Sequence, residues 1–168
     1  DAANEPSIAV DPTAPNRMAI GWRQFDTITN NFRQAGRAWS NDGGRTWHNP
    51  GPLDPGVFRS DPVLRMDKNG VLYYLSLTNT GPGLGYSCQT FKSTDGGVTY
   101  GPPVQATGGD KSWYLIDTTN SPGSGFQYQP WSLGGLADQA FSRSTDQAAT
   151  WLNPPVTPVP VWGTLDVN

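Results

Sequence analysis

The sequence predicts an all-β protein in which short antiparallel strands are joined by tight turns. Strong helix formers are scarce, since the 168 residues include one Glu and three Lys. Turn-forming residues are frequent, with 20 Gly and 16 Pro. An eight-residue phrase also recurs, because "SNDGGRTW" at 40–47 returns as "STDGGVTY" at 93–100 and as "STDQAATW" at 144–151. These three observations favour an all-β repeat protein.

Composition narrows the classes of function. The net charge of −3 predicts no basic surface, so a nucleic-acid partner is not expected. No apolar run reaches the length of a membrane span. The single Cys88 excludes an internal disulfide, and we expect it to be a small buried side chain. The sequence shows no metal-ligand spacing and no phosphate-binding loop, so neither a metal nor a cofactor is expected.

The repeat extends beyond the phrase. The phrases begin at residues 40, 93 and 144, so the repeat is about 50 residues long, the size of a propeller blade. Each unit opens with mostly apolar residues followed by Asp: "SIAVD" (7–11), "VLRMD" (63–67) and "WYLID" (113–117). Further strand-like runs follow in order: "RMAIGW" (17–22) and "GRAW" (36–39), "VLYYLSL" (71–77) and "SCQTFK" (87–92), "FQYQPWSL" (126–133) and "QAFSR" (139–143).

We therefore expect blades of four antiparallel strands. Their approximate bounds are 1–56, 57–108 and 109–160, and residues 161–168 would start a fourth blade with "TLDV". The stretch "MDKNG" (66–70) lacks the later ligands of a calcium loop and is better explained as a hairpin turn between two of these strands.

Each position of the phrase has a structural role. An Asp carboxylate accepts hydrogen bonds from backbone N–H groups of its turn, Gly adopts positive φ without steric cost, and the final aromatic residue anchors the turn. The expected structural residues are Ser40, Asp42, Gly44, Thr46 and Trp47, then Ser93, Asp95, Gly97, Thr99 and Tyr100, then Ser144, Asp146, Thr150 and Trp151.

The phrases resemble the Asp-box, or BNR repeat, of sialidase-like β-propellers. The third phrase departs from the pattern, with Gln147 and Ala148 where Gly is expected. Either Ala148 adopts left-handed geometry at a cost of roughly 1 kcal/mol, or the turn relaxes to another type. In the family the boxes lie on the face away from the active site, so the resemblance implies a structural role for the phrase. It also implies a secreted or periplasmic bacterial protein.

Three blades do not close a ring, because propellers have about 4–8 blades. We expect the chain to be about half of a six-bladed propeller, with the remaining blades supplied by a longer chain. The alternative is an assembly in which another chain completes the ring.

The starts of the first strands lie opposite the phrase turns and form the expected site. They align Glu5, Asp61 and Lys111 in one column. The catalytic candidates are Asp26, Asp61 and Asp110, and the expected substrate-binding residues are Glu5, Arg23, Arg59, Lys111 and Trp131. Carboxylates bond sugar hydroxyls, and aromatic faces stack on sugar rings. The alternative interpretation is that these are ordinary rim residues tied together in surface ion pairs.

These residues predict a protein that engages carbohydrate, either as a glycosidase-like enzyme or as a lectin-like module. It is not a standard sialidase, because Asn4 and Glu5 stand where the family has the first arginine of its Arg-Ile-Pro motif. The alternative is a non-catalytic structural or protein-interaction propeller. A glycosidase requires two carboxylates converging in a pocket, at least one with a raised pKa.

Overall fold

The computed structural model describes residues 2–81, 85–132, 140–154 and 166, and these residues form strands and turns without helices. The all-β prediction is therefore confirmed for this part of the chain. The strands are β1 (Ala2–Val10), β2 (Met18–Phe25), β3 (Arg33–Ser40), β4 (Ser60–Met66), β5 (Leu72–Asn79), β6 (Tyr86–Ser93), β7 (Val104–Thr107), β8 (Leu115–Ile116), β9 (Gln127–Pro130) and β10 (Phe141–Ser144). No described helix could cross a lipid bilayer.

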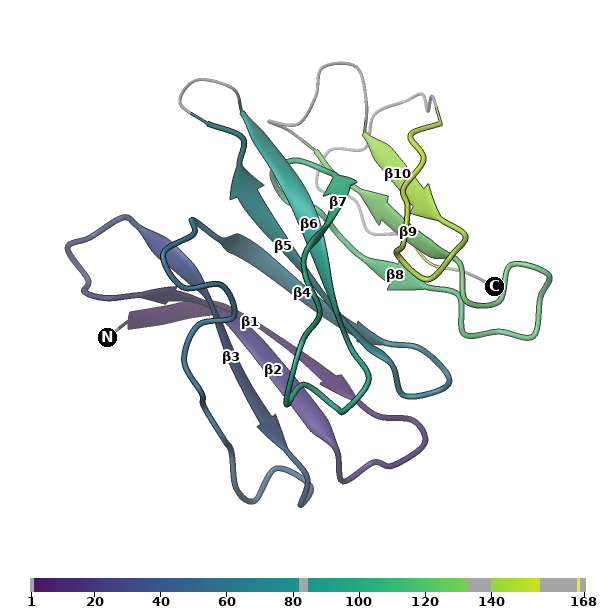
Figure 1. The fold of residues 1–168 in the computed structure, drawn as a ribbon, viewed down its shortest axis with the longest axis horizontal. Coiled ribbons are helices and arrows are strands. Elements are labelled where there is room, and N and C mark those ends of the chain that lie inside the picture. The colour runs from purple at the N-terminus through teal and green to yellow at the C-terminus, as the bar shows by residue number, and fades with distance from the viewer. Residues whose placement is uncertain (1, 82–84, 133–139, 155–165, 167–168) are drawn as a thin grey trace.

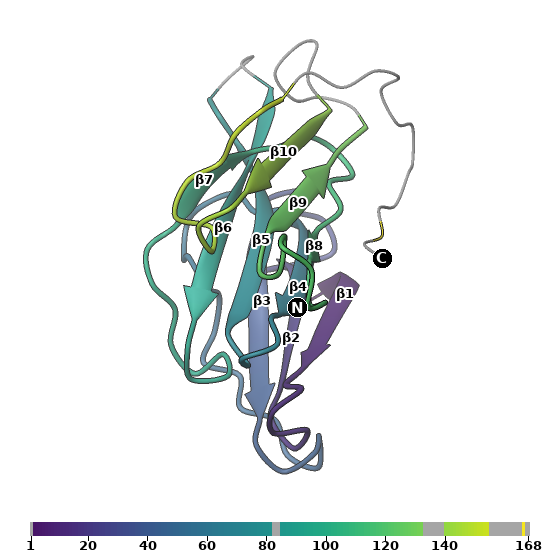
Figure 2. The ribbon, with the colours of Figure 1, turned by 90° about the vertical axis from the view of Figure 1, so that its right-hand side faces the viewer.

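The strands form three antiparallel sheets that follow one another in chain order (Figures 1 and 2). Their strand orders are β1-β2-β3, β4-β5-β6-β7 and β8-β9-β10. Within the described residues, a fourth strand is present in the middle sheet alone. In the outer sheets one antiparallel bridge takes its place, between Trp39 and His48 and between Arg143 and Leu152. The expected start of a fourth blade at 161–168 lies, apart from Asp166, outside the described residues.

The core lies between neighbouring sheets. Leu64 and Tyr74 of the middle sheet are fully buried against the first sheet, which covers them with small residues such as Ala19. Gly21 of β2 belongs to this covering surface, since a Cβ atom there would lie 2.6 Å from Cε2 of Tyr74 and 2.7 Å from Cδ1 of Leu64. These small residues let the two sheets approach closely, which explains why β2 carries Ala19 and Gly21 rather than larger apolar residues.

The Asp that ends each opening run closes the first hairpin of its unit. Asp11 accepts the backbone N–H of Thr13 (2.7 Å), and Asp67 accepts those of Asn69 and Val71 (2.9 and 3.0 Å). In the third unit, Asp117 accepts the backbone N–H of Thr119 (2.8 Å) and the hydroxyl of Ser121 (2.7 Å). The stretch at 66–70 is thus a hairpin turn.

The repeated phrases form equivalent hydrogen-bonded turns. Ser40 Oγ donates to Asp42 (2.8 Å) and accepts the N–H of Gly44 (3.0 Å). Asp42 in turn accepts the N–H and the hydroxyl of Thr46 (2.9 and 2.7 Å). The same contacts recur in the other two phrases, through Ser93, Asp95, Gly97 and Thr99, and through Ser144, Asp146, Ala148 and Thr150.

The third phrase keeps this turn without its glycines. Gln147 and Ala148 have φ values of 60° and 64°, in the left-handed region where Gly43 and Gly44 have 74° and 81°. Of the two alternatives for this phrase, the structure adopts the left-handed geometry. Ala148 is buried in the core beside Tyr114 and Trp151, so its methyl group contributes packing that offsets part of the conformational cost.

Candidate functional site

The candidate site begins with three residues in an unusual backbone conformation. Glu5, Asp61 and Lys111 have φ values of 52°, 45° and 56°, which non-glycine residues adopt infrequently. Glu5 lies within β1, Asp61 is the second residue of β4, and Lys111 precedes β8 by four residues. The pairing register of β1 with β2 shifts between Asn4 and Ser7, and that of β4 with β5 shifts beside Asp61. Such local conformations concentrate at functional sites, where the surrounding structure holds them in place.

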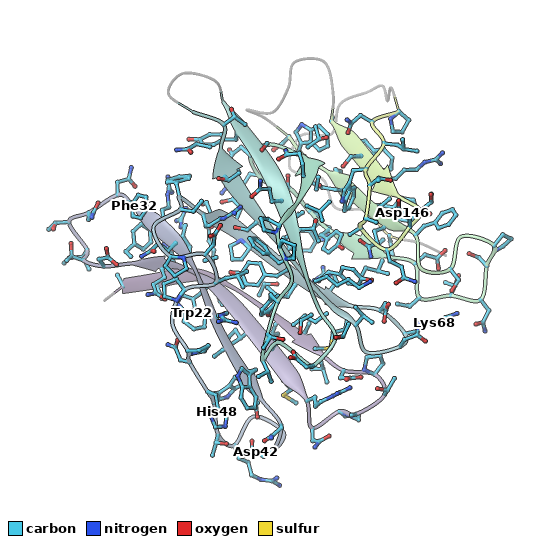
Figure 3. All side chains as sticks on the ribbon, in the orientation of Figure 1. Trp22, Phe32, Asp42, His48, Lys68 and Asp146 are labelled. Atoms are coloured by element: carbon cyan, nitrogen blue, oxygen red, sulfur yellow. The ribbon has the colours of Figure 1, made fainter. Side chains whose placement is uncertain are left out.

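The shared conformation brings the three side chains together. Glu5 Oε1 lies 3.7 Å from Nζ of Lys111 and 3.3 Å from Nη2 of Arg23. Asp61 accepts the backbone N–H of Lys111 at 3.1 Å and the hydroxyl of Ser60 at 2.8 Å. The residues aligned from the repeat therefore form one cluster at the end of the sheets opposite the phrases. Figure 3 shows Phe32 and Asp42 at these two ends of the first sheet.

A pocket of about 180 Å³, which we call the carboxylate pocket, lies at this cluster. It combines two carboxylates, three cations and two aromatic rings. Arg33 lies over the ring of Phe58 at 5.1 Å, and that ring stacks on Tyr86 with centroids 6.5 Å apart. The pocket is lined by Arg23, Arg33, Phe58, Ser60, Asp61, Leu77, Tyr86, Asp110 and Lys111.

The two carboxyl groups of this pocket differ in pKa. Burial raises the pKa of Asp110, and the negative charge of Asp61 raises it further. Burial alone would raise the pKa of Asp61, but the hydrogen bonds from Ser60 and Lys111 and the charge of Lys111 outweigh it and lower that pKa. Opposite pKa shifts in neighbouring carboxyls favour the protonated form of one and the ionised form of the other, which is the arrangement used in acid–base chemistry.

Two of the predicted substrate-binding residues, Arg59 and Trp131, are buried. Arg59 is 1% exposed and pairs with Asp54 (2.5 Å) and Gln89 (2.7 Å), while its guanidinium lies 4.9 Å from the centroid of Phe91. Trp131 is 2% exposed, so its ring faces are covered by protein. Both side chains are therefore buried in this structure, and their ring and guanidinium groups are not open to a sugar.

The third catalytic candidate lies apart from the other two. Asp26 is exposed after the end of β2, accepts a hydrogen bond from Gln34 at 3.3 Å, and does not line the carboxylate pocket. Arg33 and Phe58, which do line it, were not predicted. Within the described residues, no group of three or more His, Cys, Asp or Glu side chains has the arrangement of a metal site.

Comparisons with known proteins give the fold. No protein-family model and no curated protein matches the sequence. Among solved structures, a Hadza microbial sialidase is 17% identical with a TM-score of 0.63, over 91% of this chain and 33% of its own. A glycosyl hydrolase from Bacteroides ovatus is 12% identical with a TM-score of 0.55, over 94% of this chain and 50% of its own.

A third similar structure comes from a study of the GH130 family of mannoside phosphorylases. It is 13% identical with a TM-score of 0.55, over 94% of this chain and 50% of its own. These identities show the fold alone, and the fold is that of glycosidase-like propellers. The chain spans between a third and a half of these three structures.

Proposed function

We propose that the protein is an Asp-box propeller that binds carbohydrate in the carboxylate pocket and acts as a glycosidase-like enzyme. The observation that carries this proposal is the convergence of Asp61 and Asp110, with pKa values moved apart, in one pocket beside cations and aromatic rings. The left-handed backbone at Asp61 and Lys111 adds support. This conformation costs free energy in non-glycine residues, and such strained positions concentrate at functional sites.

Asp110 is the proton donor in this proposal. Its raised pKa favours the protonated carboxyl that can donate to a glycosidic oxygen, while the lowered pKa of Asp61 favours the carboxylate that stabilises positive charge developing on the sugar. Arg23 and Lys111 position sugar hydroxyls, and Tyr86 and Phe58 offer rings for stacking. The enzyme is not a standard sialidase, since Asn4 and Glu5 replace the arginine motif expected there.

The proposed propeller contains further blades. Ile8 and Val10 are 53% and 45% exposed, whereas their repeat equivalents Leu64 and Met66 are 0% and 9% exposed and pack against the preceding sheet. An additional sheet packed on the first one would cover Ile8 and Val10 in the same way.

We propose that the three units, at 1–56, 57–108 and 109–160, are about half of a six-bladed ring. This chain covers half the length of the Bacteroides ovatus structure, which supports a ring of about twice the length of this chain. The remaining blades would come from the same or another chain. In keeping with the Asp-box resemblance, we propose that the protein is secreted or periplasmic.

One observation favours a second candidate, a non-catalytic propeller. Glu5 pairs with both Arg23 and Lys111, so part of the site's charge is already neutralised within the protein. The carboxylate pocket, at about 180 Å³, is also smaller than common ligand pockets of roughly 300–1,000 Å³. A lectin or interaction module would tolerate loss of the Asp110 proton, whereas a hydrolase would not.

A glycan-binding and hydrolysis screen with three isosteric variants tests the proposal. Asp110→Asn should lower hydrolysis at least about 100-fold with little change in binding, because it removes the proton donor and keeps the shape. Asp61→Asn should weaken both. Asp26→Asn removes an exposed carboxylate outside the pocket and should change neither. Activity unaffected by Asp110→Asn and Asp61→Asn would refute the proposed site, and glycan binding without hydrolysis would favour the lectin-like reading.

A further inference from the structure

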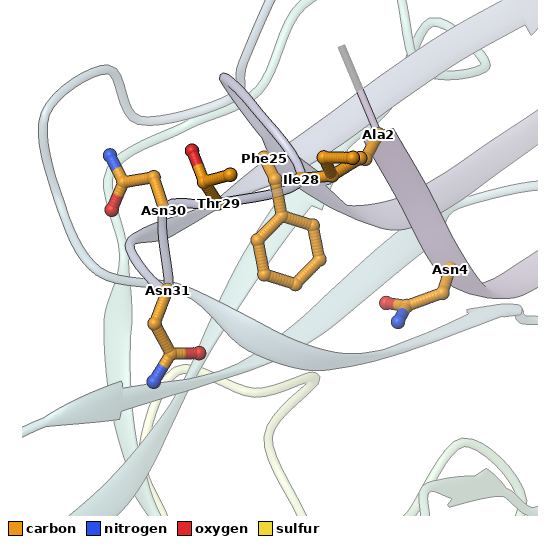
Figure 4. Close-up of a pocket in the computed structure, with 7 residues that line it drawn as sticks. All are labelled: Ala2, Asn4, Phe25, Ile28, Thr29, Asn30 and Asn31. Atoms are coloured by element: carbon orange, nitrogen blue, oxygen red, sulfur yellow. The ribbon is translucent and has the colours of Figure 1, made fainter.

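A second hollow lies next to the carboxylate pocket and carries different chemistry. Its volume is about 340 Å³, and it lies between the start of β1 and the segment that joins β2 to β3. Figure 4 shows the ring of Phe25 projecting between the side chains of Asn31 and Asn4. We call it the asparagine hollow, and its lining residues are Ala2, Asn4, Phe25, Ile28, Thr29, Asn30 and Asn31.

The lining of the asparagine hollow is uncharged and combines polar with apolar side chains. Amide groups carry both donors and acceptors, so Asn4 and Asn31 match the hydroxyl groups of a sugar without favouring either sign of charge. The Phe25 ring supplies an apolar surface beside them. This combination of one aromatic ring and several convergent polar groups is typical of sites for small neutral ligands.

Arg23 joins the two hollows. It lines the carboxylate pocket, where its Nη2 lies 3.3 Å from Glu5, and its Nε donates to Asn4 Oδ1 at 2.7 Å. Its guanidinium also lies 5.5 Å from the centroid of the Phe25 ring. Arg23 therefore contacts Asn4 of the asparagine hollow on one side and Glu5 beside the carboxylate pocket on the other. The two hollows are thus close enough for a single ligand to extend across both.

The segment that forms the outer wall is held by its own hydrogen bonds. Thr29 N–H donates to Thr27 Oγ1 (3.3 Å), Asn30 N–H donates to the carbonyl of Thr27 (3.4 Å), and Asn30 Oδ1 accepts the N–H of Phe32 (2.9 Å). These bonds fix the turn, and the side-chain amide of Asn31 takes no part in them. A wall ordered in advance lowers the entropic cost of binding.

We propose that the asparagine hollow is a second subsite that takes a neutral sugar residue, so that the ligand is an oligosaccharide of at least two residues. The inference rests on the proposed function, because the carboxylate pocket would hold the adjoining residue. The volume supports it, since the carboxylate pocket alone is below the usual range for a ligand pocket and the asparagine hollow lies within that range.

Affinity as a function of ligand length tests the subsite. The probes are glucose, mannose, galactose and N-acetylglucosamine, with the neutral di- and trisaccharides of each, titrated into the full chain by calorimetry. The wild-type protein should bind one series at least about tenfold more tightly as a disaccharide than as a monosaccharide. Phe25→Ala and Asn31→Ala should each remove most of this gain. Asn31→Ala should also leave monosaccharide affinity unchanged and the thermal unfolding temperature close to the wild-type value.

Two comparisons separate the possible failures. Val98→Ala, which trims an exposed apolar side chain at the opposite end of the sheets, serves as the control and should keep the full gain with length. Monosaccharide binding without any gain from a second residue, or a gain that survives both variants, would overturn the subsite and leave the carboxylate pocket standing. Absence of binding to every probe would overturn the subsite and the proposed function together.

Discussion

Replacing Gly21 by Ala tests the packing that places the site. A Cβ atom at this position would lie 2.6 Å from Tyr74 and 2.7 Å from Leu64, both fully buried, so the first and middle sheets would have to separate. Overpacking of this kind costs about 1–3 kcal/mol. Replacing glycine also lowers the conformational entropy of the unfolded chain, which stabilises the folded state by about 0.4–1 kcal/mol. The expected result is a net loss of about 1–2 kcal/mol in the free energy of unfolding, measured by urea denaturation.

Gly101→Ala is the matched control for this substitution. A Cβ atom there would have Lys92 O as its near neighbour at 3.7 Å, an ordinary contact, so the variant should be as stable as the wild type or slightly more so. Leu64→Val trims one of the two contacts, and the double variant with Gly21→Ala should be less destabilised than the sum of the single variants. Equal stability of Gly21→Ala and Gly101→Ala would refute the account of how the sheets pack.

Three further predictions follow from the described contacts. Hydrogen bonds from the threonines and serines of the phrases lower the pKa values of Asp42 and Asp146. The two carboxylates therefore stabilise the folded state above the unfolded-state pKa of about 3.8, and this stabilisation is lost as pH falls below it. Urea midpoints should be flat above about pH 5 and decline below about pH 4. Arg59→Ala should destabilise the protein by about 1–3 kcal/mol in the same assay, because it removes a fully buried side chain together with its contacts to Asp54 and Phe91, and a loss below about 0.5 kcal/mol would contradict that role. Because the pKa of Asp110 is raised, any hydrolysis that depends on its proton should persist above the usual carboxyl range and fall as pH rises through that pKa, and a pH–rate profile that Asp110→Asn leaves unaltered would exclude it as the acid.

Local chemistry made much of the fold predictable. Asp42 and Ser40 form the turn expected of their spacing, because the side chain and the backbone groups it bonds lie within four residues of each other. The column of Glu5, Asp61 and Lys111 was predictable from the repeat, since equivalent positions of equivalent units lie at the same end of their sheets. The left-handed backbone there was not expected, because Glu5 and Lys111 belong to residue types that adopt it infrequently.

Features that depend on how units meet were not predictable. Arg59 carries a charge, yet its side chain is buried just before β4, where it bonds Gln89, a residue 30 positions further along the chain. Trp131 was expected to face a ligand, but the structure covers it. Arg33 and Phe58 reach the carboxylate pocket because the N–H of Arg59 donates to the carbonyl of Arg33 at 2.9 Å, a contact between the first sheet and the segment leading into β4.

The most direct test of the account is to map a bound sugar by NMR. Backbone amide shifts of the full chain would be followed during titration with the tightest-binding oligosaccharide of the screen. The account predicts perturbations at Glu5, Asp61, Asp110 and Lys111, with the amides of the repeated phrases unaffected. Shifts centred on the phrases, with the carboxylate pocket unchanged, would show that the ligand binds at the other end of the sheets and would contradict the central claim.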